Sequence, residues 1–338
     1  MKKYLLIFSF LTSISCFGQG KIDSLVQVGI QYHDKGEYTK AIETYKEVLK
    51  IDPKSTWVNY ELAMTYMYSG DNEKAIKHSD VVIKQKKDHL LHAYITKGSA
   101  LDNLGKTKQS IKLFKEAIAK FGDNYLLYFN LGIAYSQIPD YKNAELAFID
   151  AIMDNPDHAS SHYRLAFTKY QQNQRVQSLL SLYYFLLLEP SSNRAETAYK
   201  LLKEQLGGNV QKDENNPMNI NIFLNPQMDT EFGAAEIMLA MLEASNSLEE
   251  NKDKTPEELF VENTKSFFTV LGELRENEKK TNIWWSVYVP YFYDLAKSEY
   301  MDVFCYYISI SSNEKAREWL KTNDEKVENF GKWINGEQ

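Results

Sequence analysis

The sequence of 338 residues predicts an all-α protein, in which a stack of helix-turn-helix pairs is followed by a second helical domain. Three observations support this fold class. Small and aromatic residues recur at a period of about 34 residues between residues 22 and 192. Glycine recurs at the turn inside three successive units, as Gly36, Gly70 and Gly105, where a left-handed backbone costs little for glycine alone. Beyond residue 229, apolar residues keep a helical spacing but lose the longer period.

Composition excludes several classes of protein. Hydrophobic residues make up 43% of the chain, which is ordinary for a packed protein and argues against disorder or a membrane-embedded bulk. The net charge of −7 argues against a nucleic-acid surface, which needs clustered lysine and arginine.

The N-terminus predicts export. Two lysines precede an apolar run over residues 4–14, and small residues follow, so residues 1–20 are interpreted as a signal peptide. A membrane anchor would need a longer run. Lipid modification at Cys16 is the disfavoured alternative, because Ser13 stands where leucine is usual. After cleavage, Cys305 is left without a partner for an internal disulfide and is expected to be an inert buried thiol.

The clearest unit covers residues 125–158. Its small, aromatic and helix-ending residues are Leu131, Gly132, Tyr135, Ala144, Phe148, Ala151 and Pro156. This order and spacing resembles the tetratricopeptide repeat (TPR) family, whose units cannot bury their apolar faces alone and stack on copies of themselves. The resemblance implies a right-handed superhelical array over residues 21–207. Its predicted units lie near residues 22–55, 56–89, 91–124, 125–158 and 159–192, with a capping helix at 193–206.

A polar linker at residues 208–228 is predicted to join this array to a C-terminal helical domain at 229–338. Within the linker, residues 220–224 are expected to form a short strand or to lie extended against the array. The domain is expected to contain a helix over 231–250 and a helix started by a capping box of Thr255 and Glu258.

Further helices of this domain are expected over 283–297, with a kink at Pro290, and over 300–310 and 313–333. The domain is similar to C-terminal regions of secreted TPR proteins of Bacteroidota, a resemblance that assigns it no function.

The TPR resemblance also implies a binding groove. In such arrays the first helix of each pair lines the concave face, through residues spaced three and four apart. On this chain the predicted groove residues are Trp57, Tyr60, Met64, Tyr68, Phe129, Ile133, Tyr163, Phe167 and Tyr170. Some family members hold a C-terminal carboxylate with lysine and asparagine, but the first unit has Val26 and Ile30 at those positions. An aromatic and methionine-rich groove suits an apolar helix or an extended peptide instead.

Catalytic and metal-binding patterns are absent from the sequence. It contains no glycine-rich phosphate loop, GxSxG, HExxH or CxxC motif, so neither an enzyme nor a cofactor is predicted. The histidine pairs His89/His92 and His158/His162 each lie about one helical turn apart but lack further ligands at a fixed spacing, so no metal site is predicted. The aromatic cluster at 283–307 is interpreted as core rather than as a sugar or peptide site.

Together these features predict an exported, non-catalytic protein of the periplasm or cell surface that binds a protein or peptide partner through the groove. The first alternative is an envelope-assembly scaffold that self-associates and fills the groove with its own C-terminal domain. The second is an enzyme with its site in the C-terminal domain, which lacks a recognisable catalytic constellation. No nucleic acid and no membrane span after signal cleavage are expected.

Overall fold

The computed structural model describes residues 20–207, 210–212, 220–222, 231–246, 248–276 and 281–337. Residues 1–19 of the predicted signal peptide, which include Cys16, and most of the predicted linker lie outside these ranges. The chain forms two compact units, unit 1 (Met1–Asp140) and unit 2 (Tyr141–Gln338). Their boundary falls at the turn inside the fourth predicted repeat, whereas the division at 208–228 stays a prediction.

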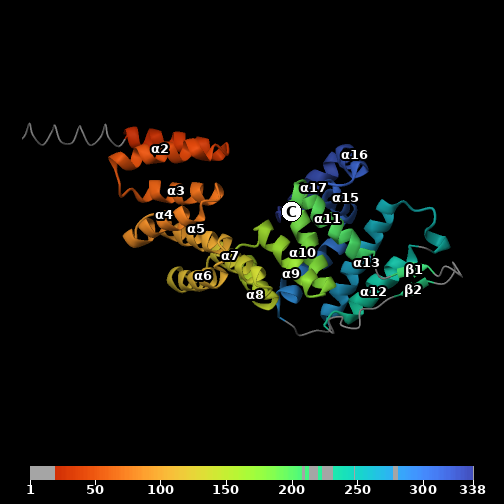
Figure 1. The fold of residues 1–338 in the computed structure, drawn as a ribbon. Coiled ribbons are helices and arrows are strands. Elements are labelled where there is room, and N and C mark those ends of the chain that lie inside the picture. Colours follow the sequence, from red (N-terminus) through yellow and green to blue (C-terminus); the bar gives the residue numbers. More distant parts are fainter. Residues whose placement is uncertain are drawn as a thin grey trace, which may run out of the picture. The chain divides into compact units, whose positions relative to one another are not determined.

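Unit 1 consists of antiparallel helix pairs (Figure 1). A helix over residues 20–34 is followed by α2 (Tyr38–Ile51), α3 (Thr56–Tyr68), α4 (Asn72–Gln85), α5 (Leu90–Asn103), α6 (Thr107–Phe121) and α7 (Tyr125–Gln137). The predicted turn glycines Gly36, Gly70 and Gly105 have φ of +74°, +88° and +71°. The left-handed turns are therefore confirmed, and each glycine is needed where L side chains are strained.

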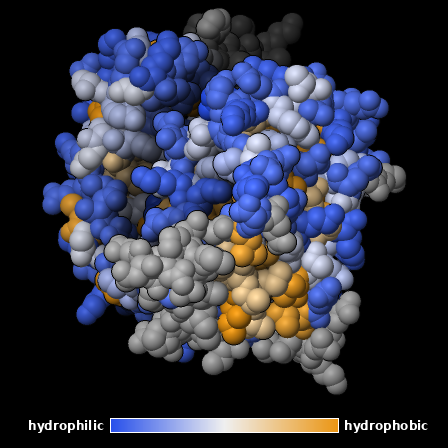
Figure 2. Space-filling model, turned by 90° about the vertical axis from the view of Figure 1, so that its right-hand side faces the viewer, coloured by the Kyte–Doolittle hydropathy of each residue, from blue (hydrophilic) through white to orange (hydrophobic). Residues whose placement is uncertain are grey.

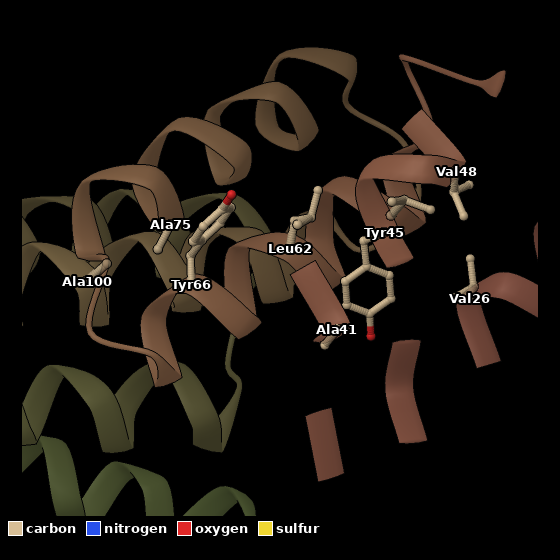
Figure 3. Packing of buried hydrophobic residues seen from close by; sticks show 9 residues of the cluster. Val26, Ala41, Tyr45, Val48, Leu62, Tyr66, Ala75 and Ala100 are labelled. Atoms are coloured by element: carbon tan, nitrogen blue, oxygen red, sulfur yellow. The ribbon is translucent and has the colours of Figure 1, made fainter. Parts of the chain in front are cut away.

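Close packing within a pair depends on a small residue that faces a large one. A Cβ added at Gly29 would lie 2.3 Å from the Tyr45 ring, and one added at Gly98 would lie 2.3 Å from the Phe114 ring. Tyr45 belongs to a buried core that joins the first two pairs, as Figure 3 shows. The other labelled members of this core are Val26, Ala41, Val48, Leu62, Tyr66, Ala75 and Ala100. The small and large residues of the 34-residue pattern therefore lie at the contacts between paired helices.

Unit 2 begins with the helices of the predicted fourth and fifth repeats and continues into the C-terminal helices. They are α8 (Tyr141–Asp154), α9 (Ala159–Gln171), α10 (Arg175–Leu188) and α11 (Asn193–Leu206). A short antiparallel pair, β1 (Val210–Lys212) and β2 (Ile220–Ile222), follows, in the register Val210 to Ile222. The remaining elements are α12 (Gly233–Ser245), η1 (Glu249–Asn251), α13 (Pro256–Glu276), η2 (Trp284–Tyr288), α14 (Val289–Lys297), α15 (Met301–Ser309), α16 (Glu314–Thr322) and α17 (Asp324–Ile334).

The centre of unit 2 is α10, whose sequence SLLSLYYFLLL is apolar around most of its circumference. It packs against α9 and α11 and also against α12, α15 and η2. Tyr183 of α10 lies edge-on to Phe268 at 4.9 Å between ring centroids, and its hydroxyl lies 3.1 Å from the Thr264 hydroxyl. The fifth predicted repeat and the C-terminal helices therefore share one core.

Most local predictions for the C-terminal helices are confirmed. The capping box is present, since Glu258 accepts from the Thr255 backbone N–H at 2.8 Å and the Thr255 hydroxyl accepts from the Glu258 N–H at 3.2 Å. The predicted kink at Pro290 takes the form of a widened turn. Pro290 cannot donate a backbone hydrogen bond, and immediately before it the Val289 N–H bonds five residues back to the Trp284 carbonyl, which makes η2 a π-helix.

Two predicted helices were too long. The helix expected over 231–250 ends at Ser245 and is followed by the short η1. The helix expected over 313–333 is divided into α16 and α17 at Asn323, whose side-chain amide donates to the Trp319 carbonyl at 2.8 Å. An asparagine that satisfies the end of one helix in this way competes with continuation of the helix.

Candidate binding surface

Six of the predicted groove residues lie in unit 1, on α3 and α7. The helices α3, α5 and α7 pack in sequence against one another, so the first helices of three pairs are neighbours. We name the exposed side of these helices the inner-face surface, defined by Trp57, Tyr60, Met64, Tyr68, Phe129 and Ile133. Tyr68 is 58% exposed and the other five are half-buried. The opposite side of α3 is buried through residues such as Val58 and Leu62.

Tyr60 is the centre of a ring cluster on this surface. Its ring stacks on that of His89, with centroids 4.9 Å apart and planes inclined by 7°, and lies 5.7 Å from that of His92. Burial raises the pKa of Tyr60 to about 12 and lowers the pKa of His89. Both groups are therefore neutral at neutral pH. The cluster offers flat aromatic area with polar edges, and His89 and His92 serve in it as ring neighbours.

Trp57 and Tyr68 stand at the two ends of α3. The Trp57 indole N–H donates to the Glu61 carboxylate at 3.1 Å, and burial raises the pKa of that carboxyl group. The Tyr68 ring lies edge-on to His33 at 5.2 Å and stacks on Tyr38 at 6.4 Å. The aromatic row thus continues from α3 to the helix over residues 20–34, which carries His33, and to α2, which carries Tyr38.

Phe129 and Ile133 are held on α7 beside α5. The Ser99 hydroxyl of α5 donates to the side-chain oxygen of Asn130 at 3.2 Å, and the Asn130 amide donates back to the Leu126 carbonyl at 2.7 Å. This polar bridge fixes the register of the two helices. It leaves Phe129 and Ile133 half-buried on the predicted stripe.

The other three predicted groove residues lie together on α9 of unit 2. Tyr163 contacts Phe167 at 4.7 Å and Phe185 at 4.9 Å between ring centroids. Tyr170 is 37% exposed, and its hydroxyl donates to Glu204 of α11 at 3.4 Å. In unit 2 the predicted residues share one helix, and in unit 1 they lie on α3 and α7, each of which packs against α5. A single groove that contains both sets stays a prediction.

Residues outside the predicted stripe of α9 contact the C-terminal helices. His162 is buried; its Nδ1 lies 2.7 Å from the Tyr288 hydroxyl and its Nε2 lies 2.8 Å from the Pro156 carbonyl. Burial lowers the pKa of His162 to about 4. This histidine holds α9 against η2, which gives it a structural role.

Sequence reasoning missed Lys169 altogether. It is 2% exposed, forms an ion pair with Glu145, donates to Gln174 at 2.6 Å and lies 5.3 Å from the Trp284 ring centroid. A lysine at a helix position usually faces solvent. Nothing in the local sequence distinguishes it, because the carboxylate and the indole come from other helices.

Within the described ranges, no three histidine, cysteine, aspartate or glutamate side chains are grouped as metal ligands. Over the same residues, no helix combines the length and apolar character that a membrane crossing requires. Cys305 is buried, and burial raises the pKa of its thiol. A thiol in this state is a poor nucleophile.

The repeated helix pairs define a helical-repeat scaffold, a class of protein that suggests protein–protein interaction. Comparison with known families agrees with this class. A family model described as TPR repeat matches residues 29–70, and one described as tetratricopeptide repeat matches residues 95–160. Tetratricopeptide repeats are therefore supported in both stretches.

Individual relatives are distant. A TPR repeat-containing protein of Methanocaldococcus jannaschii is 24% identical over 161 residues, which cover 45% of this chain and 28% of the relative. A probable UDP-N-acetylglucosamine–peptide N-acetylglucosaminyltransferase SPINDLY of Hordeum vulgare is 23% identical over 141 residues, which cover 40% of this chain and 15% of the relative. The chain thus spans less than a third of these relatives. The crystal structure of a thermophilic TPR protein from Thermus thermophilus aligns with a TM-score of 0.47 at 18% identity and covers 55% of this chain and 98% of its own.

Proposed function

We propose that this protein is an exported, non-catalytic repeat protein that binds a protein or peptide partner on its inner-face surface. The observation that carries the proposal is the aromatic row of α3, in which Tyr68 is 58% exposed and Tyr60 presents a flat ring stacked on His89. Tyrosine and tryptophan are the residues that dominate binding energy at protein interfaces. Export rests on the predicted signal peptide at residues 1–20.

The chemistry of the surface favours an apolar helix or an extended segment as the partner. Tyr60 and His89 are neutral at neutral pH, and Val26 and Ile30 stand where a carboxylate clamp would need lysine and asparagine. Polar contacts to a peptide backbone are available from tyrosine hydroxyls and from the edges of His89 and His92. Contacts of this kind orient a bound segment while the aromatic faces supply affinity.

The alternative of a groove filled by the protein's own C-terminal domain has one supporting observation, since α10 shares a core with α12 and α15. Two observations on α9 favour the binding proposal. His162 and Lys169, which lie outside the stripe, contact η2, whereas Tyr163 and Tyr170 contact α10 and α11. The predicted partner-binding residues of α9 thus have their ring and hydrogen-bond contacts with other helices of the array.

The test is the double variant Tyr60→Ala/Tyr68→Ala, compared with Tyr128→Ala as a matched control. Tyr128 is a half-buried tyrosine of α7 that lies off the predicted stripe and donates to Asp123 at 2.6 Å. We expect the double variant to lose co-purifying envelope proteins that the wild type and the control retain. The loss should correspond to about 2 kcal/mol for each hot-spot side chain.

Thermal melting of the same three proteins distinguishes a partner-binding surface from a groove that is filled by the C-terminal domain. Tyr68 faces solvent, and Tyr60 is half-buried as Tyr128 is in the control, so the double variant should melt within a few degrees of the control. Unchanged recovery of partners together with a strongly lowered melting temperature would contradict the proposal and favour the filled scaffold.

A further inference from the structure

A cavity of about 260 Å³ lies in unit 2 between α11, α12 and the start of α13. Its apolar lining consists of Leu206, Leu239, Leu242, Pro256, Leu259 and Phe260. Its polar lining consists of Lys203, Glu243, Asn246, Lys254 and Asn263. Small-molecule sites combine an apolar lining with a few polar groups in this way, although most are somewhat larger, at roughly 300–1,000 Å³.

A second cavity of about 130 Å³ adjoins the first and extends between α11, α13 and α15. The two share Lys203, Pro256 and Phe260 as lining residues. Tyr199, Tyr306 and Cys305 line the far side of the smaller cavity. Lys203 therefore stands where the two cavities meet.

The ammonium group of Lys203 differs from the other charged groups around the cavities. Its Nζ lies 4.6 Å from the centroid of the Phe260 ring, and it forms no ion pair with any described carboxylate. Lys254 pairs with Glu262 at 2.5 Å, and Glu257 accepts from the Asn313 amide at 3.2 Å. Partial burial lowers the pKa of Lys203. A bound anion would offset this cost, because an ammonium against apolar groups gains more from a partner than an exposed one does.

We propose that the two cavities form one binding site for a small amphipathic carboxylate, with its carboxylate on Lys203 and its alkyl chain in the larger cavity. One unpaired cation matches one carboxylate, whereas a phosphate ester would call for several donors. The leucine and phenylalanine lining matches an alkyl chain, at about 0.8 kcal/mol for each buried CH₂ group. The modest volume limits the chain to a short one.

The test is isothermal titration of the full chain with octanoate and, in parallel, with octanol. The variant is Lys203→Met, which keeps an unbranched stem over Phe260 and removes the charge. The matched control is Lys200→Met, on the exposed side of the same helix and outside both cavities. We expect the wild type and the control to bind octanoate saturably, and Lys203→Met to bind it at least tenfold more weakly. Octanol affinity should be the same in all three.

A blocking variant, Leu242→Trp, fills the larger cavity and should abolish octanoate binding while Lys203 remains. Octanoate could instead associate with the exposed apolar side chains Ile237, Met241 and Leu248 of unit 2, which are 41%, 61% and 44% exposed. Figure 2 shows a hydrophobic patch of this kind on one face of the molecule. The proposal is overturned if wild-type protein gives no saturable binding, if Lys203→Met binds as the wild type does, or if Met241→Ser alone removes the binding.

Discussion

Replacement of Gly98 by alanine tests the packing rule of the repeats directly. In α5 the new Cβ would lie 2.3, 2.6 and 2.9 Å from three carbons of the Phe114 ring. Ordinary van der Waals contact begins near 3.4 Å, so the ring and the methyl group must separate by about 1 Å. Phe114 is 1% exposed and cannot turn out into solvent. The helices must therefore move apart or the ring must leave its rotamer.

Two opposing contributions determine the change in the free energy of unfolding. Overpacking a filled core costs typically about 1–3 kcal/mol. Alanine in the interior of a helix gains about 1 kcal/mol over glycine through its higher propensity. Because the 2.3 Å contact is with a fully buried ring, the overpacking cost belongs to the upper part of that range. We therefore expect Gly98→Ala to lower the free energy of unfolding by about 1–2 kcal/mol net. Gly331→Ala in α17 is the matched control, because nothing lies within 4 Å of its added Cβ, and it should raise stability by up to about 1 kcal/mol.

The assay is urea unfolding of the full chain, followed by far-UV circular dichroism, with the wild type and both variants measured in parallel. The double variant Gly98→Ala/Phe114→Leu should recover part of the loss, because the smaller side chain leaves room for the methyl group. If Gly98→Ala proves as stable as the wild type, or more stable, then the close approach of α5 and α6 is wrong and with it the packing interpretation of the repeat signature.

Two further perturbations test unit 2 and the pH dependence of both units. Burial lowers the pKa of His162 and of His78 to about 4, so the unfolded chain binds more protons than the folded one between about pH 6.5 and pH 4. The free energy of unfolding should fall across this window as the pH is lowered, by up to roughly 3 kcal/mol for each group. In a series of thermal melts from pH 7 to pH 4, His162→Gln should make the melting temperature depend less steeply on pH. An unchanged pH dependence would show that His162 titrates normally. Lys169→Met leaves Glu145 without its partner and should cost roughly 2 kcal/mol or more in urea unfolding. The double variant Lys169→Met/Glu145→Leu should recover most of that loss, and equal stability of the single and double variants would contradict a buried ion pair.

The sequence by itself determined the repeat architecture and many helix ends. The turn glycines, the capping box of Thr255 and Glu258, and the helix over 193–206 are local features, set by backbone conformations and by hydrogen bonds between residues close in the chain. The small and large residues that pack against each other within a helix pair are also separated by a fixed number of positions in the sequence. Gly29 faces Tyr45 and Gly98 faces Phe114, and in both pairs the large residue follows the glycine by 16 positions. Such contacts can be predicted from the sequence because the two partners always lie the same number of residues apart.

Tertiary structure alone decided what the C-terminal helices do. The contacts of α10 with α12, α15 and η2 join segments that are in part more than a hundred residues apart, and no repeat period relates them. In the sequence, His162 is one of a pair of histidines four residues apart, and only the tertiary structure places the Tyr288 hydroxyl beside its ring. In the sequence, Lys169 does not differ from a solvated lysine, and its buried ion pair with Glu145 depends on a neighbouring helix. Lys203 lies where two cavities meet, and the residues that line them come from several helices. In each case the role of the side chain depends on groups that come from distant helices. A sequence pattern determines which residues share one face of a helix, but it does not determine which residues of other helices pack against that face.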